Sequence, residues 1–506
     1  AICLLKENIL YVDSRNQGTE TGTEEYPYKT IQKAVESVKD YCTILVKDGS
    51  GPYDVNQDIS LNEKTMLEIK PNVEIRFGSG RLLTITRGIL AEYAIFTGAT
   101  KTIGYWKGIK FLNSKKGTIT YCTIEYAQQA LYLENSENIT ISYNTISHNK
   151  GLGGANGNWS GWSPIYNGGA GGVGCGIALS SSKNNRILKN AISDNTGGNG
   201  GKGYECGSDG TGGFGCGICL SSSISNIVFD NLIRDSIGGA GSRGGIGAGI
   251  CLFSSFENTI GLNTIENSQG GGGEYGIYIS GSLNNEIEVT NRYNGYNIHY
   301  YYKKNNVEIR GEAIKAPITN LGVVVLIECS SFTITGCKIE GMRGENGETG
   351  QYDNRDPIKG SNGSLGAGIY ILSSKDGEIF GNTISDNIGG GGGAGNGASY
   401  NADAGNGGIG CGIYLQSSTN TTISNNTILQ NTGGAGGPGS LHGSGGGGGM
   451  GCGICFSFST GNTIRGNTIA NNQGGIGGTG GWHSSAGTGG IVAGIYLSSS
   501  TGNTIS

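Results

Sequence analysis

The feature that most constrains the fold is a segment of about twenty residues that recurs with fixed internal offsets along most of the chain. Three copies are GIALSSSKNNRILKNAISDN from Gly176, GICLSSSISNIVFDNLIRDS from Gly217 and GIYLQSSTNTTISNNTILQN from Gly412. An apolar anchor lies three residues after the first glycine, apolar residues follow eight and thirteen positions beyond the anchor, and Asn follows at eleven. The anchors are Leu179, Leu220, Leu252, Leu415, Phe456 and Leu497. Constant offsets imply that every copy folds in the same way and stacks on its neighbours.

Each copy contains three short extended runs with turn residues between them. β-Branched residues together with Asn, Ser and Gly dominate, which disfavours a helical repeat. The pattern predicts one coil of a three-sided solenoid with Ile and Leu pointing inward. Asn at a fixed turn position tolerates a left-handed backbone and can form a ladder of hydrogen bonds. We therefore expect an all-β protein, a right-handed three-sided parallel β-helix over residues 51–506, the handedness following from the rule for parallel crossovers.

Glycine-rich insertions separate the coils and enter at the same turn each time, so we expect them to emerge along one edge of the solenoid. The chain has 99 glycines and seven prolines, a ratio that argues against a collagen triple helix. The insertions lie at about 151–174, 196–215, 237–247, 388–410, 432–451 and 473–492. Two interpretations remain open for them. They are either flexible, solvated linkers or extended segments that pack side by side as polyglycine-II-like strands.

The first 50 residues lack the repeat and predict an N-terminal cap. Within Thr30–Tyr41, four apolar residues have helical spacing and predict an amphipathic helix; they are Ile31, Ala34, Val35 and Val38. The segment ILYVDSRNQGTETGTEEYPYKTIQKAVESV, from Ile9 to Val38, resembles the entry to secreted pectate-lyase-like β-helix proteins. In that superfamily such a helix caps the open end of the solenoid. The NxIxxNxIxxN coils also resemble those of NosD-type surface β-helix proteins. The resemblance implies the fold, and because the superfamily includes lyases, hydrolases, adhesins and structural proteins it leaves the activity open.

Composition and charge exclude several kinds of partner. The net charge is −5 and no basic run exceeds two residues, so a nucleic-acid partner is not expected. No stretch of about 20 apolar residues occurs, so a membrane span is not expected. The chain begins at Ala1 rather than Met, which fits either a processed secreted protein or a cut piece of a longer chain. We expect an extracellular or cell-surface location.

Cysteine and tyrosine recur at the third position of the G-I-x-L strand, which is expected to point outward. This position places Cys219 beside Cys251 on neighbouring coils, within the Cα separation that a disulfide requires. The position before the glycine is expected to point inward, as a buried stack of small core residues. It holds Cys175, Cys216, Cys411 and Cys452. Neither position indicates a catalytic thiol or a zinc site.

The segment 284–365 breaks the regular repeat, as functional sites often do. It contains NRYNGYNIHYYYKK, Asn291–Lys304, a cluster of aromatic residues of the kind that stacks on carbohydrate. The candidate binding residues are Tyr293, Tyr296, Tyr300, Tyr301 and Tyr302. The alternative interpretation is an outward tyrosine patch that a loop covers.

A second candidate in this segment is the charged run Glu340–Lys359. Its carboxylates supply oxygen ligands at a density that could hold Ca²⁺, the one cofactor that the sequence suggests. The candidate ligands are Glu345, Glu348, Asp353 and Asp356. The alternative interpretation is a solvated loop with surface ion pairs.

No catalytic set can be assigned from the sequence. Asp194 and Asp386 belong to repeated SDN turns, and the four histidines are scattered. We therefore expect a secreted or cell-surface structural or adhesive protein, of a filament- or sheath-forming kind. The alternatives are a polysaccharide lyase or glycoside hydrolase, and a non-catalytic carbohydrate-binding solenoid. The expected partners are a polysaccharide or cell-surface ligand, or further copies of the chain, because the repeat runs to Ser506 without a cap and bare β-edges tend to pair.

Overall fold

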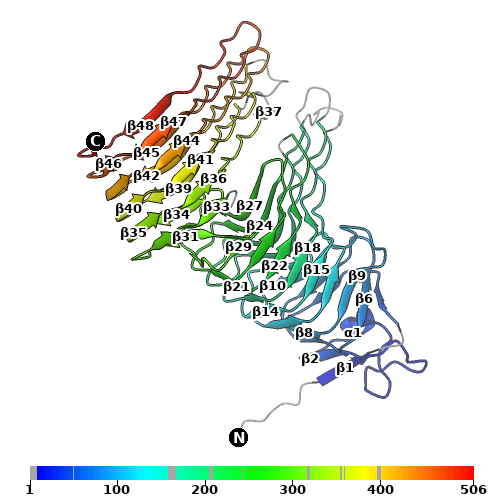
Figure 1. Cartoon of the computed structure of the whole chain (residues 1–506). Coiled ribbons are helices and arrows are strands. Elements are labelled where there is room, and N and C mark those ends of the chain that lie inside the picture. Colours follow the sequence, from blue (N-terminus) through cyan, green and yellow to red (C-terminus); the bar gives the residue numbers. More distant parts are fainter. Residues whose placement is uncertain are drawn as a thin grey trace.

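The chain forms a long parallel β-helix in two consecutive sections (Figure 1). The computed structural model describes all residues except 1–7, 49–50, 158–166, 204–208, 243, 316–318, 351, 354–355, 358 and 396–400. Around each coil the chain passes along a first side that carries the G-I-x-L strand, then a second and a third side. The glycine-rich insertions leave after the third side and return to the next first side. No helix among the described residues is both long and apolar enough to cross a membrane.

In the N-terminal section the first side consists of β4 (Ile59–Leu61), β7 (Leu82–Ile85), β10 (Gly108–Leu112), β13 (Leu131–Glu134), β16 (Gly174–Ser180), β20 (Gly215–Ser221), β24 (Ile246–Phe253) and β27 (Gly273–Ser280). The second side consists of β1 (Asn8–Val12), β2 (Cys42–Val46), β5 (Thr65–Ile69), β8 (Gly88–Glu92), β11 (Gly117–Thr120), β14 (Ile139–Ser142), β17 (Arg186–Leu188), β21 (Ile227–Phe229), β25 (Thr259–Gly261) and β28 (Glu286–Ile287). The third side consists of β3 (Tyr53–Val55), β6 (Glu74–Phe77), β9 (Ile95–Gly98), β12 (Thr123–Glu125), β15 (Thr145–Ser147), β18 (Ala191–Ser193), β22 (Leu232–Arg234), β26 (Thr264–Glu266), β29 (Arg292–Tyr293) and β30 (Tyr296–Asn297).

The C-terminal section repeats this arrangement. Its first side consists of β31 (His299–Tyr302), β34 (Val324–Ile327), β39 (Gly366–Leu372), β42 (Gly410–Gln416), β45 (Gly451–Ser457) and β48 (Val492–Ser498). Its second side consists of β32 (Glu308–Arg310), β35 (Ser330–Thr335), β40 (Lys375–Phe380), β43 (Thr419–Ser424), β46 (Thr463–Arg465) and β49 (Thr504–Ile505). Its third side consists of β33 (Ala313–Lys315), β36 (Lys338–Glu340), β41 (Thr383–Ser385), β44 (Thr427–Leu429) and β47 (Thr468–Ala470). Two short pairs complete the strands: β19 (Asn195–Thr196) with β23 (Ser236–Ile237), and β37 (Tyr352–Asp353) with β38 (Asp356–Pro357).

The repeat offsets predicted the core correctly. Leu179 lies directly beside Leu220, and Leu220 beside Leu252, on parallel neighbouring strands. The anchors of the inner coils are buried, as are the apolar residues that follow at eight and thirteen positions. The core is therefore a stack of Ile, Leu and Val columns that runs along the inside of the rod.

Buried Asn and Ser ladders close the corners between the sides. Asn190 Nδ2 donates to Asn231 Oδ1 at 3.0 Å and to the carbonyl of Ile141 at 3.0 Å. The expected Asn ladder is thus present, but the left-handed residue of that turn is the one before the Asn, such as Lys189 with φ 54° or Asp230 with φ 57°. The Asn itself points inward and satisfies backbone groups that the turn leaves without partners.

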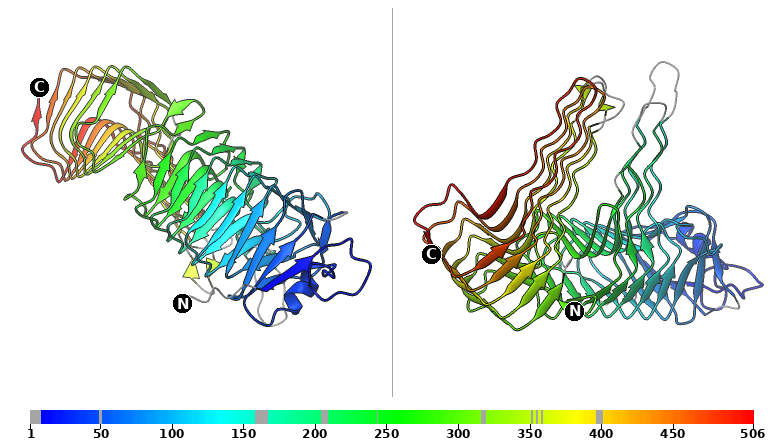
Figure 2. Two further views of the ribbon diagram at one scale, coloured as in Figure 1. Left: turned by 90° about the horizontal axis from the view of Figure 1, so that it is seen from below. Right: turned by 45° about the horizontal axis from the view of Figure 1, so that its top comes forward.

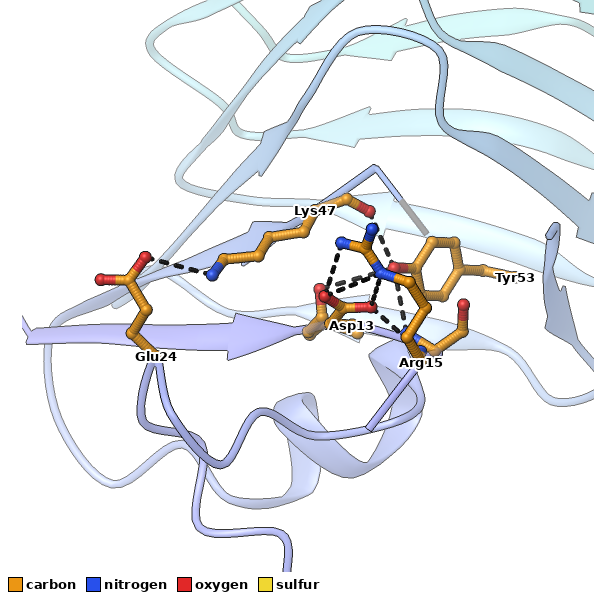
Figure 3. Close-up of polar contacts among 7 residues, drawn as sticks. Asp13, Arg15, Glu24, Lys47 and Tyr53 are labelled. Carbon is orange, nitrogen blue, oxygen red and sulfur yellow. Dashed lines mark hydrogen bonds and ion pairs between the residues drawn. The ribbon is translucent and has the colours of Figure 1, made fainter. Parts of the chain in front are cut away.

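The N-terminal region contains the short helix α1 (Ile31–Glu36), whose Thr30 side chain caps its first turn and whose Ile31 and Ala34 are buried. The helix is shorter than the spacing predicted, and its role as a seal on the end of the core stays a prediction. Figure 3 shows the polar contacts beside it. Arg15 Nη2 lies 2.8 Å from Asp13 Oδ2, Lys47 Nζ lies 3.1 Å from Glu24 Oε1, and the Tyr53 hydroxyl donates to the Lys47 carbonyl at 2.8 Å.

Candidate functional site

The glycine-rich insertions form two projections on one edge of the rod, one from each section (Figure 2, right). Each insertion leaves the third side as an outgoing strand and comes back as a return strand. The glycines of these strands hydrogen-bond to the insertions of neighbouring coils, as expected for insertions that share one entry turn.

The hydrogen bonds of the glycine strands repeat every three residues. Gly197 and Gly200 donate to carbonyls of the next insertion, those of Ile237 and Ala240, both at 2.7 Å. Gly198 and Gly201 donate to the preceding insertion, at Gly172 and Gly169, both at 2.8 Å. A three-residue repeat with neighbours in several directions is the packing of polyglycine-II strands. The described parts of the insertions are therefore packed layers rather than flexible linkers.

Close backbone contact explains why two of every three residues in these strands are glycine. A Cβ on Gly434 would lie 1.8 Å from the carbonyl oxygen of Gly390, and a Cβ on Gly437 would lie 2.1 Å from that of Gly393. Ala435 and Pro438, at the third positions, are exposed and have room for a side chain. Only glycine fits at the crowded positions of the inner insertions, which explains their GGxGGx pattern.

A second, outer core lies between each glycine layer and the first side of the solenoid. In the N-terminal section it contains Cys175, Cys216, Cys219, Cys251 and Tyr278, all buried. In the C-terminal section its buried members are Ala367, Cys411, Cys452 and Cys455. An apolar residue near the end of several return strands packs against this core; these residues are Phe214, Ile246, Ile409 and Met450. We did not predict these apolar residues from the sequence. A recurring GGΦG pattern, in which Φ is apolar, precedes the G-I-x-L strand in several coils and would have revealed them.

The cysteine before each G-I-x-L glycine points outward, which corrects the inward placement expected from the sequence for Cys175, Cys216, Cys411 and Cys452. The glycine itself takes the inward position, since a Cβ on Gly217 would lie 2.3 Å from Ile233 Cγ2. Two consecutive residues, Gly217 and Ile218, thus face the main core, and the strict alternation assumed for the strand fails there.

The possible disulfide between Cys219 and Cys251 is not formed in this structure. The two residues are direct partners on β20 and β24, as the offsets predicted, but both are free and buried thiols. On parallel strands in register, side chains at matching positions point the same way, toward the glycine layer, rather than at one another. Burial raises the pKa of Cys251 to about 11 and also raises that of Cys411. These thiols therefore act as small apolar residues of the outer core.

A polar cleft of about 1320 Å³ runs along the foot of the C-terminal glycine layer. Its base follows the turn at which the chain leaves the third side. There, isolated parallel β-bridges join successive coils through Arg343, Ile388, Thr432 and Gln473. Glycines of the layer and residues 270–275, at the start of β27, also line it. The cleft thus lies where the two sections meet.

The charges of the cleft are mixed and solvent-facing. Lys315 and Arg343 are exposed and have no ion-pair partner among the described residues. Glu274 and Asp386 supply carboxylates, and Gln430, Asn471 and Gln473 supply amides farther along. Asp386 accepts a hydrogen bond from Ser385 Oγ at 2.6 Å in a left-handed turn, as Asp194 does from Ser193 Oγ at 2.8 Å. These contacts favour the turn role expected for both aspartates.

The tyrosines of the irregular segment do not form one exposed platform. Tyr293 and Tyr300 are only 3% and 2% exposed, and the Tyr300 hydroxyl donates to the Leu283 carbonyl at 2.5 Å. Tyr296, Tyr301 and Tyr302 are half-buried. The patch is thus divided between the core and the surface, which differs from the five-residue stacking face expected from the sequence.

Buried His299 lies beside these tyrosines. Its Nε2 lies 3.0 Å from Glu312 Oε2, and its Nδ1 lies 3.1 Å from the Tyr301 hydroxyl. Burial lowers the pKa of His299. The neutral imidazole thus holds a glutamate and a tyrosine in place at the start of the C-terminal section.

The candidate calcium ligands are only partly described. Glu345 is half-buried, and its Oε2 accepts from the Tyr278 hydroxyl at 3.5 Å, whereas Glu348 is exposed. The side chains of Asp353 and Asp356 lie outside the described part, although their backbones pair in β37 and β38. Within the described residues no three His, Cys, Asp or Glu side chains meet as a metal-binding group. Calcium binding here stays a prediction.

Comparison with known proteins relates the chain to other β-helices. A family model described as "Right handed beta helix region" matches residues 53–162 and 108–273. No curated protein sequence matches. Similar solved structures include the Family 28 exopolygalacturonase of Yersinia enterocolitica. It is 9% identical to this chain, the match covers 97% of this chain and 78% of that one, and the TM-score is 0.26. The DFA-IIIase of Arthrobacter chlorophenolicus A6 is 11% identical over 91% of this chain and 98% of that one, with a TM-score of 0.31. Identities and TM-scores this low say nothing of the activity of this chain.

Proposed function

We propose that this right-handed parallel β-helix acts outside the cell as a structural or adhesive scaffold. The observation that carries this proposal is the ordering of the glycine insertions. Backbone hydrogen bonds join insertion to insertion, and an outer core fixes each layer to the rod. Insertions without a function would need neither these hydrogen bonds nor an outer core.

A packed glycine layer is better suited to binding another molecule than to catalysis. Its glycines have no side chains with which to perform chemistry, and ordering them costs conformational entropy that the hydrogen bonds and the outer core must offset. The result is a rigid projection whose tip carries other residues. At the C-terminal tip Trp482 is 67% exposed, and the His442 ring contacts the Trp482 carbonyl oxygen at 2.8 Å. Rigid aromatic side chains of this kind are frequent in recognition surfaces.

The polar cleft supports a polysaccharide as the adhesive ligand. Amides, hydroxyls and two cations that have no ion-pair partner within the described part of the chain match the hydrogen-bonding groups of a glycan chain that lies parallel to the rod. Catalysis would in addition need a positioned acid and base, and the Asp386 carboxylate of the cleft is held by its neighbour Ser385. We therefore propose binding without cleavage.

The test measures binding and cleavage in the same samples. The purified protein is incubated with pectin, alginate and glycosaminoglycans, and we measure retention by affinity electrophoresis, new reducing ends and unsaturated products. Retention without product supports the proposal, while release of either product overturns it in favour of an enzyme. Lys315→Ala with Arg343→Ala should weaken retention, and Arg465→Ala, an exposed cation outside the cleft, should leave it unchanged.

A further inference from the structure

Three tyrosines form a stacked ladder at the corner between the second and third sides, away from the glycine insertions. Tyr93, Tyr121 and Tyr143 occupy the same turn in three successive coils. Both stacked pairs have ring centroids 4.8 Å apart, with interplanar angles of 7° and 17°. The three side chains are 50%, 43% and 45% exposed. The ladder is thus an ordered row of phenols on the surface.

Folding alone does not account for tyrosine at this turn. The backbones of Tyr93, Tyr121 and Tyr143 are left-handed, with φ of 53°, 54° and 57°. Most coils of the C-terminal section place glycine at the same turn: Gly311, Gly336, Gly381 and Gly466. Glycine adopts this conformation freely, whereas a bulky residue does so at a cost. The gain from two stacked pairs is of the same order as that cost, so the ladder brings little net stability.

The stack leaves the ring edges as its reactive surface. The Tyr121 ring lies between the other two rings. Lys189, on the coil that follows Tyr143, places its Nζ 5.4 Å from the centroid of the Tyr143 ring. Both faces of Tyr121 and Tyr143 and one face of Tyr93 are therefore covered, which disfavours face-on stacking with a sugar. The Tyr143 side chain also hydrogen-bonds to Lys189. The edges of Tyr93 and Tyr121, which carry the hydroxyl and the two carbons beside it, remain for contact with solvent or with another molecule.

We infer that this ladder is an oxidative cross-linking site that joins two copies of the chain through dityrosine. The inference rests on the proposed scaffold role, because it names a second copy as the partner. With a peroxidase and hydrogen peroxide as oxidant, each of two phenols gives up one electron and one proton. The two phenoxyl radicals form a carbon–carbon bond between ring positions next to the hydroxyls, and restoration of both aromatic rings leaves both hydroxyls in place. The two electrons and two protons reduce one hydrogen peroxide to two waters.

The geometry favours a bond between chains over one within the ladder. A carbon–carbon bond between two phenols requires their edges to meet. Stacked rings that are nearly parallel and anchored on neighbouring coils present faces to each other instead. Their edges are free to meet the edge of a ring on a second rod. A radical formed on one ring can also be shared with its stacked neighbours, which prolongs its opportunity to react.

The experiment treats the purified protein with horseradish peroxidase and hydrogen peroxide. Covalent dimers are measured on reducing denaturing gels, dityrosine by its fluorescence, and the linked residues by peptide mapping. The variant Tyr93→Phe/Tyr121→Phe/Tyr143→Phe keeps the stack and removes the phenols. The control Tyr26→Phe/Tyr41→Phe removes two other exposed tyrosines, which are 43% and 56% exposed. We expect the ladder variant to lose most of the dimer and the control to keep it.

The inference fails if the ladder variant dimerises as well as the unchanged protein, or if mapping finds only bonds within one chain or at other tyrosines. These outcomes leave the scaffold proposal standing, because its own test measures glycan retention and product release without oxidant. Cleavage of a polysaccharide by a protein that also forms the mapped cross-link would overturn the scaffold proposal alone.

Discussion

Asn231 donates from Nδ2 to Oδ1 of Asn263, its counterpart one coil farther along, at 2.9 Å, and both side chains are buried. Asn231 Nδ2 also lies 3.0 Å from the carbonyl oxygen of Ile187, and its own Oδ1 accepts from the backbone and side chain of Asn190. One side chain thus connects three coils. Removal of such a buried partner leaves polar groups without hydrogen bonds, a larger cost than the loss of an exposed bond.

We therefore expect Asn231→Ala to lower the free energy of unfolding by about 2–4 kcal/mol, because several buried groups lose a partner at once. Urea denaturation followed by circular dichroism measures the change. Gln269→Ala replaces an exposed amide and serves as the control, with an expected change within about 0.5 kcal/mol. Equal effects of the two substitutions would show that the ladder contributes no more than a surface amide.

Adjacent glycines of the C-terminal layer test whether the layer is packed. A Cβ on Gly448 would lie 1.9 Å from the Gly475 carbonyl oxygen, while a Cβ on Gly447 has nothing nearer than Asn406 Oδ1 at 3.4 Å. We expect Gly448→Ala to open the layer and raise amide hydrogen exchange across residues 432–451, and Gly447→Ala to leave exchange nearly unchanged. Rapid exchange throughout this segment in the unchanged protein would contradict a packed layer.

The glycine layer should also protect the thiols beneath it. In the folded protein Cys216 and Cys251 should resist iodoacetamide at pH 8, because both are buried and because burial raises the pKa of Cys216 and raises that of Cys251 to about 11. Gly213→Ala, whose Cβ would lie 2.1 Å from the Gly172 carbonyl oxygen, should expose them. Gly153→Ala, with 3.7 Å to the nearest atom, is the matched control. Mass spectrometry of alkylated peptides measures each thiol separately, and equal labelling of the two variants would argue against the protection.

The Asp13–Arg15 contact gives the N-terminal region a pH dependence. The hydrogen bond from Arg15 lowers the pKa of the Asp13 carboxyl below its ordinary value. The contact therefore adds stability above the pKa of the unfolded chain, near 3.8, and loses it as the pH falls through the lower folded pKa. Asp13→Asn should destabilise this region by under about 1 kcal/mol at pH 7, since Arg15 is half exposed, and by less at pH 3. Hydrogen exchange of β1 at the two pH values measures the difference. A larger effect at pH 3 would reverse the expected sign.

A core glycine offers a test of the corrected strand geometry. Gly217→Ala would place a Cβ 2.3 Å from Ile233 Cγ2 and should cost about 1–3 kcal/mol through overpacking. Gly489→Ala, with 3.9 Å to the nearest atom, should be close to neutral. Both changes are read from thermal melts. A neutral Gly217→Ala would imply that Cys216, rather than the glycine, faces the main core.

The sequence predicted the parts of this protein that depend on periodicity. Leu179, Leu220 and Leu252 recur at a fixed distance from the next buried Ile, and one stacked coil satisfies all these distances together. The same argument predicted the Asn ladder and the single edge from which the insertions emerge. It failed at Cys175 and Cys216, because strict alternation does not anticipate a glycine that turns inward against an Ile of another side.

The sequence alone determined the coil, its apolar columns and the position of the insertions, because each follows from the local spacing of side chains. Only the tertiary structure decided whether the glycine segments pack, because that depends on carbonyl groups of other insertions many residues away, such as Leu152 and Gly172 around Gly198. It also decided which tyrosines are buried. Tyr293 lies in the core because its side chain points inward from the strand β29. Tyr121 lies on the surface because it occupies the turn between β11 and β12.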